Sequence, residues 1–136
     1  MDHYLHVLKN YFQFSGRARR QEYWIFTLVN LLVTALAIVI DNITGLTVES
    51  EFYGLFYILY CLAVMIPGLA VAIRRLHDTG RSGWYFLLAF IPVVGSIWLL
   101  ILFCLNGETG PNQYGENPKE TEFLNSLDPV IENPEV

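Results

Sequence analysis

The chain has 136 residues, of which 54% are hydrophobic and only 15% are charged. A soluble domain of this length could not cover so much apolar surface, and a disordered chain would contain far less of it. The formal net charge of −5 comes from the C-terminal end, because residues 106–136 hold seven acidic residues and one basic residue. Two cysteines are too few for a disulfide scaffold. The composition therefore predicts a small, all-α integral membrane protein.

The first segment of the chain is predicted to be a short amphipathic helix. Its apolar side chains recur at helical spacing while Lys9, Asn10 and Gln13 face away from them. Such a helix can lie at the membrane interface, or it can pack against a partner or another loop of this chain. The apolar positions are Tyr4, Leu5, Leu8, Tyr11 and Phe12.

Three uncharged stretches follow, at residues 23–40, 52–73 and 84–105. As helices rising 1.5 Å per residue they would reach about 27 to 33 Å, which matches a hydrocarbon core of about 30 Å. The sequence therefore predicts three transmembrane helices. Pro92 and Gly95 interrupt the third stretch, so it can instead turn back as a re-entrant hairpin.

Basic residues gather on one side of these stretches. Four precede the first stretch and three lie between the second and the third, whereas the loop at 41–51 has none. The positive-inside rule makes this side cytoplasmic. Three crossings then place the C-terminus in the periplasm, and a re-entrant third stretch would place it in the cytoplasm. We predict a single membrane domain at 1–118 and a flexible acidic tail at 119–136.

The first two stretches each carry a stripe of polar or small residues. Lipid cannot satisfy a hydroxyl or an amide, and small residues let helices approach closely. We therefore predict that the two stripes meet. A polar pathway through Asn30 is the functional alternative to simple packing. The stripes comprise Thr27, Asn30, Thr34, Ala37 and Asp41 in the first stretch and Gly54, Cys61 and Gly68 in the second.

The predicted cytoplasmic side of residues 1–105 holds six arginines and a single lysine. Guanidinium groups bind phosphate and carboxylate in a bidentate geometry that lysine cannot provide. This preference predicts a site for an anionic lipid head group or another phosphate-bearing ligand, supported by Glu22, His77 and Asp78. The alternative is a topology signal combined with internal arginine–carboxylate pairs. The arginines are Arg17, Arg19, Arg20, Arg74, Arg75 and Arg81.

His77 and Asp78 suggest a general base beside a carboxylate, but adjacent residues on a helix do not face each other. Asp78, Thr79 and Gly80 are better explained as a helix end with a left-handed glycine. No cluster of His, Cys, Asp and Glu has the spacing of a metal site. We predict no catalytic residue, no cofactor, no metal and no nucleic-acid partner.

Three polar segments surround the apolar stretches, at residues 11–24, 74–84 and 107–118. In this order they resemble the domain-of-unknown-function-805 (DUF805) family, the YhaH/YhaI-like bacterial inner-membrane proteins. The resemblance covers about residues 4–118. It implies a bacterial inner-membrane location and a small helical membrane fold. It implies no activity, so no catalytic residue is carried over.

Three functions follow as hypotheses. The first is a non-enzymatic membrane protein whose arginine-rich cytoplasmic face binds anionic phospholipid or a partner protein. The second is a small transport or channel component, which would act as a homo-oligomer because three helices enclose little lumen. The third is an enzyme acting on a phosphorylated membrane substrate, with His77 as the base.

Overall fold

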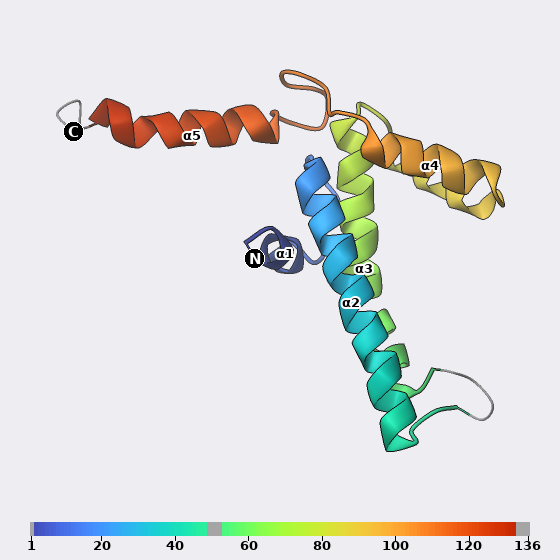
Figure 1. The fold of residues 1–136 in the computed structure, drawn as a ribbon. Helices are drawn as coiled ribbons and strands as arrows, with labels where there is room; N and C mark the ends of the chain where they lie inside the picture. Colours follow the sequence, from blue (N-terminus) through green and yellow to red (C-terminus); the bar gives the residue numbers. More distant parts are fainter. Residues whose placement is uncertain (1, 49–52, 133–136) are drawn as a thin grey trace. The chain divides into compact units, whose positions relative to one another are not determined.

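The computed structural model describes residues 2–48 and 53–132, and its elements are helices (Figure 1). Phe52, at the start of the second predicted stretch, and residues 133–136 of the predicted tail lie outside the described residues. The helices are α1 (Asp2–Lys9), α2 (Arg20–Thr44), α3 (Leu55–Asp78), the 3₁₀ helix η1 (Gly83–Phe90), α4 (Val94–Cys104) and α5 (Pro118–Glu132).

The contacts within the chain define two compact units, whereas the sequence predicts one domain at 1–118. Unit 1 comprises Met1–Gln13 and Gln21–Val71, and unit 2 comprises Phe14–Arg20 and Ala72–Val136. Unit 1 therefore contains α1 and most of α2 and α3. Unit 2 contains the end of α3 with η1, α4 and α5.

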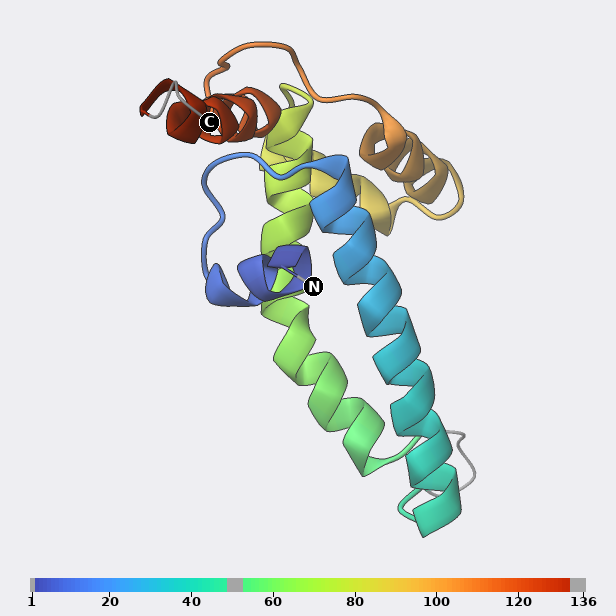
Figure 2. The ribbon, with the colours of Figure 1, turned by 60° about the vertical axis from the view of Figure 1, so that its left-hand side comes forward.

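Unit 1 is dominated by the two long helices, which run side by side in both ribbon views (Figures 1 and 2). The first predicted stretch lies within α2, and the described part of the second, from residue 53 onward, lies almost entirely within α3. Only 11% of the apolar window of α2 and 22% of that of α3 are buried. The core helix of a soluble protein would bury such residues, so this exposure fits helices that face lipid.

A buried aspartate joins α2 to the beginning of α3. The carboxylate of Asp41 accepts hydrogen bonds from the backbone N–H groups of Gly54, Phe56 and Tyr57 at 3.1, 3.0 and 2.9 Å. These donors have no partner within the first turn of a helix, so Asp41 caps α3 from another element. Gly54 permits this approach, because a Cβ there would lie 2.3 Å from the carbonyl oxygen of Leu46.

The predicted N-terminal helix is present as α1 and packs on α2. The rings of Tyr4 and Phe26 stack with their centroids 5.5 Å apart. His6 Nδ1 lies 3.2 Å from the carboxylate of Glu22, which is buried one turn before Phe26 on α2. Val7, fully buried, faces the same way. Tyr4 and Val7 are therefore covered within unit 1. The predicted apolar face differs in part, because Leu5 and Phe12 are 50% and 72% exposed and the helix ends at Lys9, before Tyr11 and Phe12.

The third apolar stretch is not a continuous helix, which corrects the prediction of a single helix at 84–105. Its first part forms η1 and its second part forms α4, and the two helices contact each other. Gly95 lies so close to the backbone of Leu88 that a Cβ would be 1.8 Å from the Leu88 carbonyl oxygen. The break therefore follows from Pro92, which cannot continue a helix, and from Gly95, which lets the two halves meet.

The C-terminal end also differs from the expected structure. The sequence predicts a flexible tail at 119–136, whereas the structure has α5 from Pro118 to Glu132. Asn117 precedes this helix, and its side-chain oxygen accepts a hydrogen bond from the Lys119 N–H at 3.0 Å. A proline at the first position and an asparagine cap are typical of a helix start.

Candidate functional site

The site begins where α3 ends, at residues 74–80. Gly80 adopts φ +71°, and its N–H donates to the carbonyl of His77 at 3.0 Å. This confirms the predicted left-handed helix end. The chain then restarts at Ser82, whose hydroxyl accepts a hydrogen bond from the Trp84 N–H. The end of α3 and its turn thus fix the positions of the polar residues between them.

Asp78 binds two arginines at the centre of unit 2. Arg17 Nε donates to Asp78 Oδ1 at 3.0 Å, and Arg75 donates to Oδ2. The side chains of Arg17, Arg75 and Asp78 are 1%, 0% and 8% exposed. Buried charges of this kind are stable only when they are paired and hydrogen-bonded. We call these three residues the Asp78 cluster.

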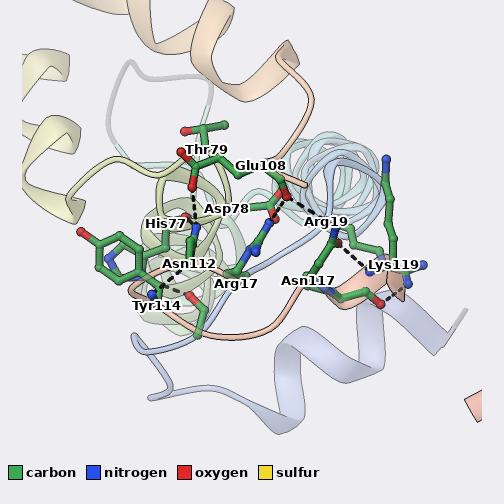
Figure 3. A network of polar contacts seen from close by, with 12 residues as sticks. Arg17, Arg19, His77, Asp78, Thr79, Glu108, Asn112, Tyr114, Asn117 and Lys119 are labelled. Atoms are coloured by element: carbon green, nitrogen blue, oxygen red, sulfur yellow. Dashed lines mark hydrogen bonds and ion pairs between the residues drawn. The ribbon is translucent and has the colours of Figure 1, made fainter. Parts of the chain in front are cut away.

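The remaining guanidinium donors of the Asp78 cluster bind backbone carbonyls. Arg17 donates to the carbonyls of Gly110 at 2.7 Å and of Glu108 at 2.5 Å. Arg75 donates to the carbonyls of Phe103, at 3.3 Å, and of Leu105. Only a guanidinium presents enough donors in one plane for these contacts. The cluster therefore ties the segment before α2 to the end of α3 and to the loop after α4 (Figure 3).

His77 is held beside the Asp78 cluster by packing. Its ring stacks on Tyr114 with centroids 3.8 Å apart and planes 3° from parallel (Figure 3). Its Nδ1 lies 3.2 Å from the carbonyl oxygen of Gly16, so Nδ1 carries the proton in the neutral ring. Asn112 donates to the backbone carbonyl of His77 at 3.0 Å. The carboxylate of Asp78 is directed to arginines, so it does not orient the imidazole.

A second group of polar residues lines a cleft in unit 2 of about 220 Å³. Two of them, Arg19 and Lys119, are cationic. Arg19 also donates to the carbonyl of Pro118 and pairs with Glu122, whose side chain is 66% exposed. We call this site the Arg19–Lys119 cleft. Its lining residues are Arg19, Asp78, Asn106, Gly107, Thr109, Asn117 and Lys119.

The structure divides the six predicted arginines among different surroundings. Arg17 and Arg75 belong to the Asp78 cluster, and Arg19 lines the cleft. Arg20 is exposed and donates to the Asn106 side chain at 2.8 Å. The remaining two, Arg74 and Arg81, each form a backbone hydrogen bond. Arg74 is buried and accepts from the Ala18 N–H, and the N–H of half-buried Arg81 donates to Leu76.

Of the three predicted supporting residues, Asp78 and His77 lie in unit 2. Glu22 lies in unit 1, where it contacts His6. The residues that complete the cleft were not singled out from the sequence. Asn106, Asn117 and Lys119 follow the third apolar stretch, which the three-span topology assigned to the opposite side of the membrane. The turn-forming composition of 107–118 was the available signal.

The predicted packing residues lie in unit 1. Asn30 is half-buried, and its Oδ1 accepts a hydrogen bond from the Tyr60 hydroxyl at 2.6 Å. Its amide donates to the carbonyl of Phe26 at 2.6 Å. Thr27 is exposed and its hydroxyl bonds the carbonyl of Tyr23. Thr34, Cys61 and Gly68 are half-buried, and Ala37, Asp41 and Gly54 are buried.

Comparisons with known proteins agree on one family. Residues 11–116 match the family described as "Protein of unknown function (DUF805)". The chain is 54% identical to the inner membrane protein YhaI of Escherichia coli (strain K12) over 119 residues, which cover 88% of this chain and 97% of YhaI. It is 44% identical to inner membrane protein YhaH of the same strain, covering 88% and 98%. No solved structure matches the chain.

Proposed function

We propose, on the premise that this chain belongs to the DUF805 family and lies in the bacterial inner membrane, that its Arg19–Lys119 cleft binds the phosphate of an anionic lipid head group. The proposal places the cleft at the cytoplasmic surface, as the distribution of basic residues predicts. It narrows the six-arginine site expected from the sequence to one guanidinium and one ammonium group.

The observation that carries the proposal is the balance of charge at the cleft. Two cations, Arg19 and Lys119, line it, and the acidic residue among its lining is Asp78. Asp78 already accepts hydrogen bonds from Arg17 and Arg75, so its charge is balanced without the two cations of the cleft. A guanidinium and an ammonium together suit a phosphate, which offers several acceptor oxygens.

Neutral donors in the cleft support the same ligand. Asn106, Thr109 and Asn117 line it with the two cations. The Asn117 amide already donates to Glu120 Oε1 at 3.0 Å, so the neutral donors for a ligand are those of Asn106 and Thr109. Gly107 lets the loop pass close to Asp78 in the wall of the cleft, because a Cβ at this position would lie 2.1 Å from the Asp78 carboxylate. A phosphodiester bound in the cleft could therefore contact both charges and a neutral donor.

The pair between Arg19 and Glu122 is compatible with this function. The Glu122 carboxylate is 66% exposed, whereas the Arg19 side chain is 16% exposed. Solvent therefore reaches the carboxylate and weakens its hold on the guanidinium. A phosphate carried at high local concentration in the membrane surface can displace such a carboxylate. Glu122 thus occupies the guanidinium when no lipid phosphate is present.

The test compares variants of the full-length chain in which one basic residue is replaced by glutamine. Purified protein in a zwitterionic detergent is titrated with short-chain phosphatidylglycerol, and the bound lipid is counted by native mass spectrometry. Arg19→Gln and Lys119→Gln should each weaken binding about fivefold, since a basic residue near an anionic surface contributes about 1 kcal/mol. The matched control is Lys9→Gln, which removes an exposed charge in α1.

Two further measurements identify the ligand. Phosphatidylcholine and inorganic phosphate are titrated in parallel, so that a free anion is distinguished from a lipid head group. Glu122→Gln should strengthen phosphatidylglycerol binding because the competing carboxylate is gone. Equal affinities for the Arg19, Lys119 and Lys9 variants would contradict the proposal.

A further inference from the structure

We infer that the η1–α4 hairpin, residues Gly83–Cys104, is inserted from the cytoplasmic side into the hydrocarbon of one leaflet without crossing it, so that both termini lie in the cytoplasm. This goes beyond head-group binding, because it assigns a lipid-facing surface and a topology. The argument depends on three features of unit 2: where the hairpin begins and ends, what it exposes, and how its tip is bonded.

Both ends of the hairpin lie at the end of α3. At its start, a Cβ on Gly83 would lie 2.8 Å from the side chain of Ile73. At its end, Arg75 donates to the carbonyls of Phe103 and Leu105. A straight helix over the same 22 residues would separate its ends by about 33 Å. The chain therefore leaves and returns on one side.

The chain that follows the hairpin is also held on that side. Arg17, which precedes α2, donates to the carbonyls of Glu108 and Gly110. The Asn112 side chain and the Tyr114 ring contact His77, near the end of α3. Arg17 and the end of α3 lie on the basic side of the two long helices. With the C-terminus there as well, Lys119 joins the other seven basic residues.

The surface of the hairpin suits hydrocarbon. Phe90 is 80% exposed and Val93 at the tip is 70% exposed. A shallow apolar depression of about 390 Å³ runs along η1, between Ser82 and Ile91. Such exposure in water would be an aggregation hazard. The exposed apolar residues are Trp84, Tyr85, Leu87, Phe90, Ile91, Val93, Val94, Ile97, Trp98, Leu100 and Ile101.

The length of the hairpin corresponds to one leaflet. The 8 residues of η1, at about 2.0 Å each, and the 11 residues of α4, at about 1.5 Å each, both extend about 16 Å. A hydrocarbon core of about 30 Å is roughly twice this depth. The tip then lies near the middle of the bilayer.

Several backbone N–H groups of the tip are bonded within the tip itself, which favours a place in hydrocarbon. Ile91 N–H donates to Leu88, Gly95 N–H to Ile91 and Ile97 N–H to Val93, while Pro92 has no N–H to satisfy. The Val94 N–H donates to the Pro92 carbonyl at 2.8 Å, which closes a γ-turn at Val93. Val93 has φ +65° there, a strained conformation for a β-branched residue. The strained γ-turn supplies the Val94 N–H with a partner from within the chain, which a segment in hydrocarbon needs because water is absent there.

The test is cysteine accessibility in the full-length chain after Cys61→Ala and Cys104→Ala remove the native thiols. Single cysteines replace Gln13 before α2, Gln113 after the hairpin and Thr44 at the far end of α2. All three positions are exposed. A membrane-impermeant maleimide is applied to spheroplasts and to inside-out vesicles. We expect Gln113→Cys and Gln13→Cys to be labelled in inside-out vesicles, which expose the cytoplasmic face. Thr44→Cys should be labelled in spheroplasts instead.

The tip is tested with Val93→Cys and Val94→Cys, two variants so that misfolding of one does not decide the result. We expect neither to react in either preparation and both to react after detergent is added. Labelling of Gln113→Cys together with Thr44→Cys would show that the third stretch crosses the membrane. Labelling of both tip variants in inside-out vesicles would show that the hairpin lies in water or against a soluble partner. Either result would overturn the inference.

Discussion

The two units each contain a buried aspartate at one end of α3, and these carboxylates are satisfied in opposite ways. Asp41 in unit 1 accepts three neutral backbone N–H groups at the beginning of α3. Asp78 in unit 2 is the last residue of α3 and binds the guanidinium groups of Arg17 and Arg75.

The helix dipole explains the difference. The first turn of a helix is partially positive, so it stabilises a carboxylate with its own N–H groups. The last turn is partially negative and destabilises one. Asp78 therefore needs cations, whereas Asp41 does not. The comparison predicts that unit 2 is more sensitive than unit 1 to the loss of its aspartate.

The largest effect is expected for Asp78→Ala. It leaves the guanidinium groups of Arg17 and Arg75 buried without their carboxylate, which costs about 3 to 5 kcal/mol of unfolding free energy. Reversible denaturation in detergent micelles, followed by circular dichroism, measures the loss. The matched control is Arg20→Gln, at an exposed position of unit 2, with an expected change below about 0.5 kcal/mol.

A second variant sharpens this prediction. Arg17→Met in the Asp78→Ala background removes one of the orphaned charges. It should make the double variant more stable than the sum of the two single losses predicts. Simple additivity would show that the two residues do not act as one buried cluster.

A smaller effect is expected for Asp41→Ala. The variant removes a helix cap but leaves no buried cation, so the loss should be about 1 to 2 kcal/mol. The same denaturation experiment measures it, with Asn42→Ala as a control at the neighbouring exposed position. A loss equal to that of Asp78→Ala would contradict the distinction between the two units.

The smallest effect is expected for Tyr60→Phe. This change removes the hydrogen bond between the Tyr60 hydroxyl and Asn30, the described side-chain contact between α2 and α3 near their middle. Hydrogen bonds between helices inside membranes contribute on average about 0.6 kcal/mol. Thermal unfolding in micelles should show a small decrease in Tm. A loss as large as that of Asp41→Ala would indicate that Asn30 does more than support packing.

The local pattern of the sequence was enough to predict the membrane location, the two long helices, the presence of a short N-terminal helix and the glycine-terminated end of α3. Hydropathy and helical spacing depend on neighbouring residues and add along the chain, so they can be read without a structure. The resemblance to DUF805 was also available, because its motifs are local.

Tertiary structure decided how the polar residues were used. Six arginines looked equivalent in the sequence. Contacts between distant segments distinguish Arg17, bound to Asp78, from Arg19 in the cleft. Arg75 meets Asp78 three residues along α3 but also binds the carbonyls of Phe103 and Leu105. Pro92 and Gly95 offered a broken third stretch as an alternative, but the sequence alone could not choose it, since the residues of this stretch are as apolar as those of the first two. Its fold depends on the approach of Gly95 to Leu88 and on the bonds from Arg75 to the end of α4. Hydropathy cannot report such contacts, because it records how apolar each residue is and not which residues approach one another.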